Sequence, residues 1–176
     1  FERLLEIYNR YSIACLTIHP RVQTQFYKGT VYRDWFAWAA ERSRNPLCYN
    51  GDLVTVEDCG AFEADFPAID AVMIGRGAVA DPALFRKLRG GTPATRREIQ
   101  TFTRTLYQSY QEFYGQVGPA AQRMKEVWFF LIRLFEGGER HHKRMRRLRT
   151  PAEYEAVEAA IFRELPLRDH AEGACG

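Results

Sequence analysis

Three short apolar runs, each followed by a polar loop, restrict the fold of this chain more than any other feature. They cover residues 13–18, 47–49 and 68–74, and amphipathic segments with helical spacing separate them. Strands that are apolar on both faces and alternate with helices indicate a parallel sheet covered by helices. Three such units are too few for a closed eight-stranded barrel or a stable open sheet. Since the chain also begins with Phe1, we expect a fragment of a longer protein.

The second half of the chain has a different periodicity. From Thr95 onward no strand-like run remains, and the apolar spacing predicts four helices over residues 96–114, 119–135, 140–149 and 151–165. Thr150 and Glu153 form a capping box for the last of them, as Thr55 caps a helix in the first half. Four helices of this length fit a small bundle. Because residues 90–93 are rich in Gly and Pro, we predict an α/β domain over residues 1–90 and an all-α domain over residues 91–176.

Composition excludes several classes of protein. With 46% hydrophobic and 27% charged residues, the chain is expected to be globular. No run approaches the roughly 20 apolar residues that span a bilayer, and the first ten residues carry charges, so we expect a cytoplasmic protein without a membrane segment. The cysteines form no CxxC pair, which predicts buried free thiols and no metal site at Cys15, Cys48, Cys59 and Cys175.

Positive charge is concentrated in the second half. The net charge is +3, yet residues 140–149 contain six Lys or Arg and no acid. Such density is typical of contact with a nucleic-acid phosphate backbone. The alternative is a solvated helix face paired with Glu136, Glu139 or Glu153. Lys125 extends the predicted surface, whereas Trp128, Phe129 and Phe130 on the same helix are interpreted as core. The predicted RNA-binding residues are Lys125, Arg140, Lys143, Arg144, Arg146, Arg147 and Arg149.

Polar residues follow each of the three predicted strands. Carboxyl ends of parallel strands meet at one edge of a sheet, where glycines let the backbone approach a phosphate and a cation adds charge. The negative carboxylate of Asp52 does not favour a phosphate, so Asp52 is expected to cap the next helix or to accept hydrogen bonds from ligand hydroxyls. Together these loops predict a site for a phosphorylated cofactor or substrate formed by His19, Pro20, Arg21, Asn50, Gly51, Asp52, Gly75, Arg76 and Gly77.

The same residues resemble a known family. They are similar to the last three βα units of flavin-dependent tRNA-dihydrouridine synthases. In chain order, the matching residues are LTIHPR, then Gln25, Tyr27 and Gly29, then Asp34 and Trp35, then YNGD and DAVMIGRGA. The helical tail has the place and size of that family's C-terminal domain. The resemblance implies the C-terminal portion of a TIM (β/α)8 barrel followed by a helical tRNA-binding domain.

The resemblance also implies a cofactor and a reaction. FMN would bind with its phosphate near Asn50, Gly51 and Asp52 and near Gly75, Arg76 and Gly77, with His19 close to the flavin and Arg21 facing the flavin or tRNA. NADPH would reduce the flavin, which then reduces the C5–C6 double bond of a uridine flipped out of the RNA stack.

The catalytic cysteine and a flavin-contacting lysine of that family belong to the first half of the barrel, and nothing in this chain matches their motifs. We therefore expect the chain alone to be inactive. Because a cut barrel exposes a strand edge, we also expect the missing N-terminal half or a second copy of the chain to complete the sheet. Two alternatives stay open at this point: a non-catalytic RNA-binding module, and another phosphate- or flavin-binding TIM-barrel enzyme.

Overall fold

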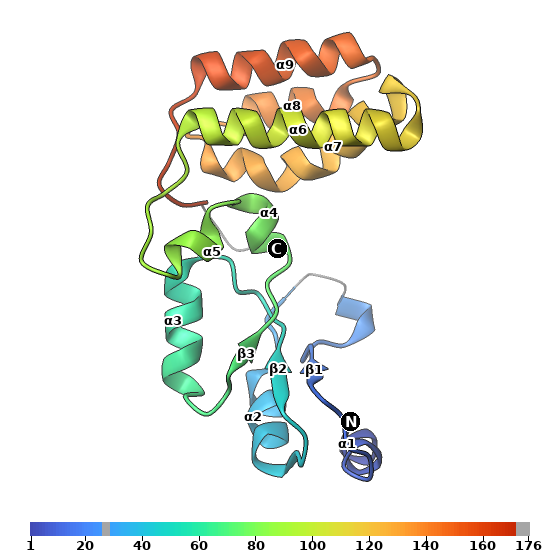
Figure 1. Ribbon diagram of the computed structural model, residues 1–176, viewed down its shortest axis with the longest axis vertical. Coiled ribbons are helices and arrows are strands. Elements are labelled where there is room, and N and C mark those ends of the chain that lie inside the picture. The colour runs from blue at the N-terminus through green and yellow to red at the C-terminus, as the bar shows by residue number, and fades with distance from the viewer. Residues whose placement is uncertain (26–28, 172–176) are drawn as a thin grey trace. The chain divides into compact units, whose positions relative to one another are not determined.

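The computed structural model describes residues 1–25 and 29–171, which form two compact units (Figure 1). The first unit covers Phe1–Gly75, and the second begins at Arg76. Two residues used in the sequence analysis, Tyr27 and Cys175, lie outside the described residues.

A three-stranded parallel sheet forms the centre of the first unit. Its strands are β1 (Leu16–Ile18), β2 (Leu47–Tyr49) and β3 (Ala71–Val72), in the order β1-β2-β3. Ile18 is in register with Tyr49, and Tyr49 with Val72. The predicted βα rhythm and the parallel direction are confirmed, although β1 and β3 are shorter than the apolar runs that predicted them.

Burial is uneven across this sheet. All three residues of β2 are buried, because β2 has a strand on each side. At the end of β3, Val72 is 40% exposed and Met73 is 48% exposed. The prediction that all three strands are buried on both faces is therefore wrong for β1 and β3. Each of them pairs with β2 alone among the described residues, so one side of each lacks a neighbouring strand.

Helices α1 (Glu2–Tyr8), α2 (Arg33–Arg42) and α3 (Val56–Asp65) accompany the sheet, with a 3₁₀ turn η1 (Gln23–Gln25) after β1. An aromatic cluster joins α2, β2 and α3: the ring centroids of Tyr49 and Phe62 lie 4.2 Å apart, and those of Phe36 and Tyr49 lie 4.8 Å apart. Edge and offset contacts of this kind add to the apolar burial. As predicted, Thr55 caps α3 in a capping box with Asp58.

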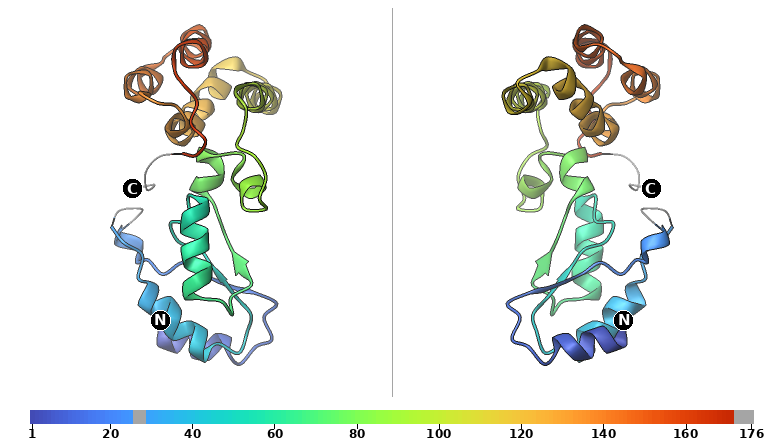
Figure 2. Two further views of the ribbon diagram at one scale, coloured as in Figure 1. Left: turned by 90° about the vertical axis from the view of Figure 1, so that its left-hand side faces the viewer. Right: turned by 90° about the vertical axis from the view of Figure 1, so that its right-hand side faces the viewer.

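Up to residue 171, the last residue that the structure describes, the regular elements of the second unit are helices, and its one β contact is an isolated bridge between Phe135 and Leu167. The unit contains α4 (Arg76–Ala80), α5 (Leu84–Lys87), α6 (Arg96–Tyr114), α7 (Val117–Leu131), the 3₁₀ turn η2 (Ile132–Leu134), α8 (Glu139–Arg147) and α9 (Pro151–Glu164). Figure 2 looks nearly along the axes of α6 and α9. The four long helices agree with the sequence prediction within a few residues, and Thr150 caps α9 as expected. They share one core, which includes Met124, Trp128, Leu131, Tyr154 and Ile161.

The boundary between the two structural units lies earlier in the chain than the predicted boundary near residue 90. Helix α4 contacts α7, and Ala80 of α4 is fully buried in the core of the helical unit. The segment between Arg76 and Gly90 therefore packs with the helices that follow it. As functional domains, the divisions 1–90 and 91–176 remain a prediction.

Candidate functional site: the carboxyl edge of the sheet and a basic helix

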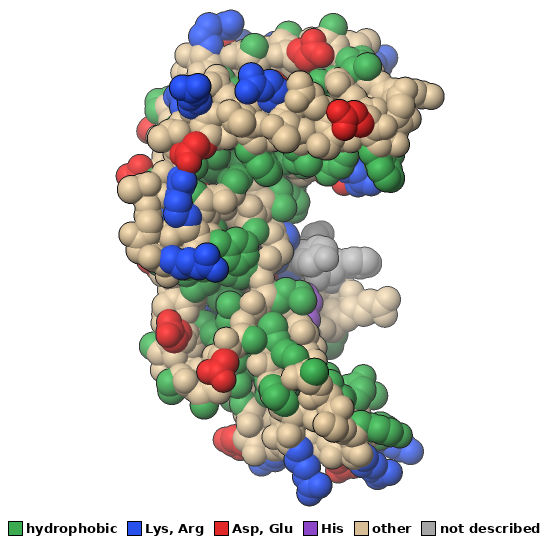
Figure 3. All heavy atoms as spheres, viewed as in Figure 1, with side chains coloured by type: hydrophobic (Ala, Val, Ile, Leu, Met, Phe, Trp, Pro, Cys, Tyr) green, Lys and Arg blue, Asp and Glu red, His purple; other side chains and the backbone are tan. Residues whose placement is uncertain are grey.

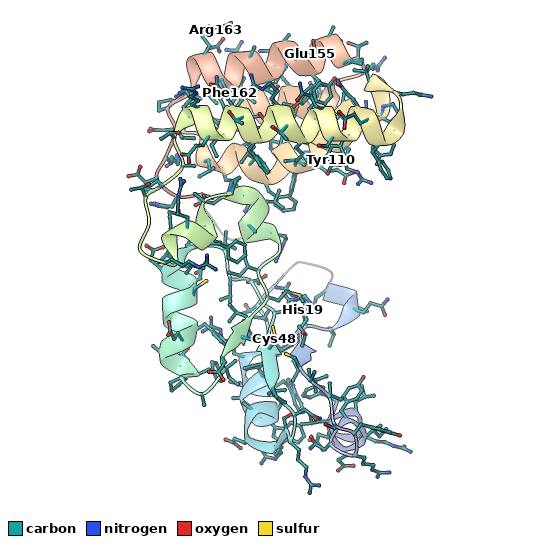
Figure 4. All side chains as sticks on the ribbon, in the orientation of Figure 1. His19, Cys48, Tyr110, Glu155, Phe162 and Arg163 are labelled. Atoms are coloured by element: carbon teal, nitrogen blue, oxygen red, sulfur yellow. The ribbon has the colours of Figure 1, made fainter. Side chains whose placement is uncertain are left out.

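His19, Pro20 and Arg21 follow β1 directly, as the sequence predicts. Ile18 is buried at the end of the strand, and the chain then emerges so that His19 is exposed. In Figure 4, His19 lies beyond the end of β1, whereas Cys48 lies within the sheet. A pocket of about 380 Å³ opens at this edge and is lined by residues that include Ile18, His19, Arg21, Tyr32 and Trp35.

Asn50, Gly51 and Asp52 follow β2. Packing explains the glycine at position 51: a Cβ there would lie 2.6 Å from the buried Tyr49 hydroxyl oxygen, so a side chain does not fit. Asp52 adopts a left-handed conformation with φ 47°, which short polar residues tolerate best after glycine. The Asn50 amide contacts the sulfur of Met73, with 3.3 Å between Nδ2 and Sδ. The loop is thus fixed by the strands on both sides of it.

Arg21 and Asp52 are brought together from the ends of β1 and β2. Arg21 Nη2 lies 2.5 Å from Asp52 Oδ2, and Nη1 donates to the Gly29 carbonyl at 3.1 Å. The Arg21 side chain is only 2% exposed, and that of Asp52 is 28% exposed. The expectation that Asp52 caps the following helix is wrong, because Thr55 occupies that position and the Asp52 carboxylate accepts from Arg21.

The third predicted loop divides between the two units. Gly75 ends the first unit, and a Cβ built on it meets no atom within 4 Å, so its backbone surface is open. Arg76 and Gly77 open α4 in the second unit, where Gly77 is buried and its carbonyl accepts from the Asp81 amide at 2.8 Å.

The cysteines only partly match the sequence prediction. Cys48 and Cys59 are buried, and burial raises the pKa of both thiols. Cys15 was expected inside a strand, yet it is exposed and precedes β1 at the opposite end from His19. In the part of the chain that the structure describes, no group of three or more His, Cys, Asp or Glu side chains is arranged to hold a metal ion.

Helix α8 carries most of the predicted RNA-binding residues. Five of them, Arg140, Lys143, Arg144, Arg146 and Arg147, lie on α8, and Arg149 follows its end; all six are exposed, while His141, Met145 and Leu148 are buried. Four of them line one open pocket of about 500 Å³ together with Gly137 and Glu139; these four are Arg140, Lys143, Arg144 and Arg147. Helical spacing accounts for this grouping, since residues three, four and seven apart share a face.

Two of the acids proposed as partners for these cations are placed differently: Glu153 is engaged at the start of α9, whereas Glu139 lines the same pocket as four of the cations. Glu153 accepts from the backbone amides of Arg149 and Thr150, which are N-terminal contacts of α9. Among residues 1–25 and 29–171, none of the four pocket-lining cations forms an ion pair with an acid. Figure 3 shows the opposite side of the unit, where Lys and Arg side chains are scattered over α6 and α9.

Lys125 differs from the α8 cations. Its ammonium donates to Gln122 Oε1 and to the Leu148 carbonyl, each at 2.8 Å, so it ties α7 to the end of α8. Phe129 also differs from its predicted role. It was expected in the core with Trp128, but it is 40% exposed whereas Trp128 is fully buried. Consecutive residues of a helix point about 100° apart, so three in a row cannot all face one core.

Within the described ranges, no helix combines the length and the apolar character that crossing a membrane requires.

The first unit belongs to the class of parallel α/β proteins whose polar loops follow the carboxyl ends of the strands. Residues 3–165 match the family model described as dihydrouridine synthase, and the chain belongs to this family. The family fold is a TIM barrel, with which three parallel βα strands are consistent.

Curated relatives point the same way. The chain is 31% identical over 155 residues to a tRNA-dihydrouridine(16) synthase of Cupriavidus necator, covering 82% of this chain and 46% of the relative. It is 40% identical over 77 residues to a protein of the same name from Ralstonia nicotianae, covering 44% and 23%. A tRNA-dihydrouridine synthase B of Shewanella oneidensis is 35% identical over 77 residues, covering 44% and 24%. The chain thus spans less than half the length of these relatives.

Proposed function

We propose that the full-length protein is a cytoplasmic, FMN-dependent tRNA-dihydrouridine synthase that reduces a uridine in tRNA with NADPH as electron source. The observation that carries this proposal is the family match over residues 3–165, together with relatives named as tRNA-dihydrouridine synthases. Such names do not support the reading as a different phosphate-binding barrel enzyme.

The residues at the carboxyl edge of the sheet fit a flavin phosphate. Asn50 is a half-buried polar side chain at a strand end, His19 is exposed beside it in the chain's first unit, and Gly75 leaves its backbone uncovered. FMN, when bound, supplies the hydride for the uracil ring. We propose that His19, Asn50, Gly51, Asp52 and Gly75 contact it, and that Arg76 and Gly77 add a cation and a close backbone approach.

Arg21 has a more specific role in this proposal. Its buried guanidinium is held by Asp52 and by the Gly29 carbonyl, so it fixes the loop after β2 against the end of β1. Positioning of that loop determines where the backbone of Gly51 stands. The sequence-based expectation that Arg21 faces the flavin or tRNA remains a prediction beside this structural role.

We propose further that α8 binds the tRNA backbone and that the helical domain is a small bundle serving this purpose. The support is the set of exposed cations on one face of α8: Arg140, Lys143, Arg144 and Arg147 form no ion pair with an acid among the described residues. Backbone contacts of this type position a nucleic acid without reading its sequence.

The sheet itself needs further strands in this proposal. β1 pairs on one side only among the described residues, and the exposed Val72 and Met73 leave apolar surface at β3. We propose that the N-terminal half of the longer protein completes the barrel, with a second copy of the chain as the alternative. The catalytic cysteine and lysine would belong to that half.

The test uses the purified full-length protein. Flavin released by denaturation should be identified as FMN by mass spectrometry. With NADPH and an unmodified tRNA transcript, the protein should form dihydrouridine at one position. A colourless protein that leaves the transcript unchanged would favour the reading as a non-catalytic RNA-binding module.

A further inference from the structure

A second pocket adjoins the basic one at the start of α8. It has a volume of about 330 Å³ and is lined by residues that include Phe129, Arg133, Phe135, Gly138, Glu139 and His142. Glu139 lines both this pocket and the basic pocket formed by Arg140, Lys143, Arg144 and Arg147. The two pockets therefore lie next to each other at the start of α8.

An exposed aromatic ring forms one wall of this second pocket. Phe129 is 40% exposed, although it sits between the fully buried Trp128 and the partly buried Phe130. Its ring centroid lies 5.4 Å from that of His142, with an angle of 63° between the ring planes. The Phe130 ring contacts Phe129 as well, at 4.9 Å between centroids and 86° between planes. The exposed part of the Phe129 ring borders the pocket.

Polar groups with different hydrogen-bonding character converge on the same pocket. His142 Nε2 is buried and has no hydrogen-bond partner among the described residues, and two charged residues, Glu139 and Arg133, also line the pocket. Burial and the nearby Arg146 and Arg133 lower the pKa of His142. The imidazole is therefore neutral near pH 7, with one donor and one acceptor nitrogen.

The neighbouring histidine is engaged differently. His141 is 5% exposed and contacts Glu164 of α9, with 3.1 Å between Nε2 and Oε2. Its side chain is thus committed to the interior of the helical unit, and only His142 serves the pocket.

We infer that this pocket binds an unstacked RNA base, next to a phosphate backbone that runs along the α8 cations. An aromatic face, a guanidinium and groups that can pair with a base edge are the features by which proteins hold single-stranded bases. Because the two pockets share Glu139, a base held in this pocket would lie next to the cations of α8 that are proposed to contact the phosphate backbone. The inference rests on the proposed tRNA binding and deepens it by naming a base subsite.

The test compares two exposed phenylalanines of the same unit. Phe129→Ala removes the proposed stacking wall, and Phe129→Trp restores it. Phe113→Ala is the matched control, since Phe113 is 80% exposed and lines a different pocket with Tyr110 and Val127. Binding of the full-length variants to unmodified tRNA is measured by fluorescence anisotropy over a series of KCl concentrations. A short single-stranded RNA with one 2-aminopurine reports stacking directly through its quenching.

Phe129→Ala should weaken tRNA binding about tenfold, the size of one lost base–aromatic stack. Its salt dependence should equal that of the parent protein, because no phosphate contact is lost. The 2-aminopurine quenching should fall with Phe129→Ala, return with Phe129→Trp, and be unchanged in Phe113→Ala.

Equal affinity and equal quenching for Phe129→Ala and Phe113→Ala would overturn the base subsite. If Arg144→Gln with Arg147→Gln still flattened the salt dependence in that case, the proposed tRNA binding would stand without the subsite. A parent protein that shows no salt-dependent tRNA binding would overturn both.

Discussion

Arg21 and Asp52 form an ion pair between the ends of two neighbouring parallel strands, with 2.5 Å between Nη2 and Oδ2. Asp52 holds its left-handed backbone conformation at φ 47° while accepting from a guanidinium that is only 2% exposed. The pair therefore connects the two loops that carry His19 and Asn50. It fixes the two loops relative to each other at the carboxyl edge of the sheet, where the cofactor is predicted to bind.

Removing the charge of Asp52 should destabilise the protein. Asp52→Asn keeps a residue that tolerates left-handed φ but leaves the buried Arg21 charge without its carboxylate, so unfolding should become easier by roughly 3 kcal/mol. The control is Asp65→Asn, whose pair with Arg33 has side chains 38% and 59% exposed, and which should cost less than about 1 kcal/mol. Thermal melts of the full-length variants check this, and equal shifts would refute the special role of the Arg21 pair.

The start of α6 should contribute to pH-dependent stability. Hydrogen bonds from Arg86 and from Thr95 lower the pKa of Glu98 to about 2. A lowered folded-state pKa stabilises the protein fully above the unfolded value near 4.3, and this contribution is lost as the pH falls towards 2. Glu98→Gln should thus melt at a lower temperature than the parent at pH 7, and the difference should close between about pH 4 and pH 2.

Glu112→Gln provides the comparison on the same helix. Within residues 1–25 and 29–171, the Glu112 carboxylate takes part in no ion pair. Its substitution should leave the melting temperature at pH 7 nearly unchanged. A difference in melting temperature between Glu98→Gln and the parent protein that stayed constant down to pH 2 would contradict the role assigned to the Glu98 carboxylate.

Neutralising one face of α8 should change the salt dependence of tRNA binding. Changing Arg140, Lys143, Arg144 and Arg147 to Gln should weaken binding and reduce the slope of log affinity against log salt by roughly one unit per lost phosphate contact. Arg97→Gln with Arg104→Gln is the control, because these exposed cations lie on α6, on the other side of the unit from α8. An unchanged slope in the α8 variant would count against the proposed surface.

The 176-residue polypeptide should lack synthase activity by itself. Cys48 and Cys59 are buried, and Cys15 precedes β1, so none of these thiols stands at the edge that carries His19 and Asn50. Incubation of the purified polypeptide with FMN, NADPH and tRNA should give no dihydrouridine above background by mass spectrometry. Measurable product would contradict this expectation.

Local signals in the sequence predicted much of the fold. The capping boxes at Thr55 and Thr150 use side chains and amides within three residues, so they can be identified from the sequence alone. Strand β2 was also predicted to the residue, because a short apolar run before Asn50 has no helical alternative. The ranges predicted for β1 and β3 were too long, since apolar composition does not reveal that each strand has a neighbour on one side only.

Contacts between distant residues were not predictable in the same way. The sequence placed Arg21 and Asp52 at one sheet edge, but their pairing depends on the register of β1 and β2. The buried ion pair of Asp81 with Lys87 was missed, because six residues apart is not a helical pairing distance. The exposed Phe129 was assigned to the core by its neighbours, although the 100° step between adjacent helix residues could have separated it from Trp128.

The central claim is that the full-length protein makes dihydrouridine in tRNA. The direct measurement is position-resolved mass spectrometry of tRNA from cells in which the gene for the full-length protein has been deleted. We predict that dihydrouridine disappears at one position and returns when the intact gene is supplied on a plasmid. A tRNA pool with dihydrouridine unchanged at every position would contradict the account.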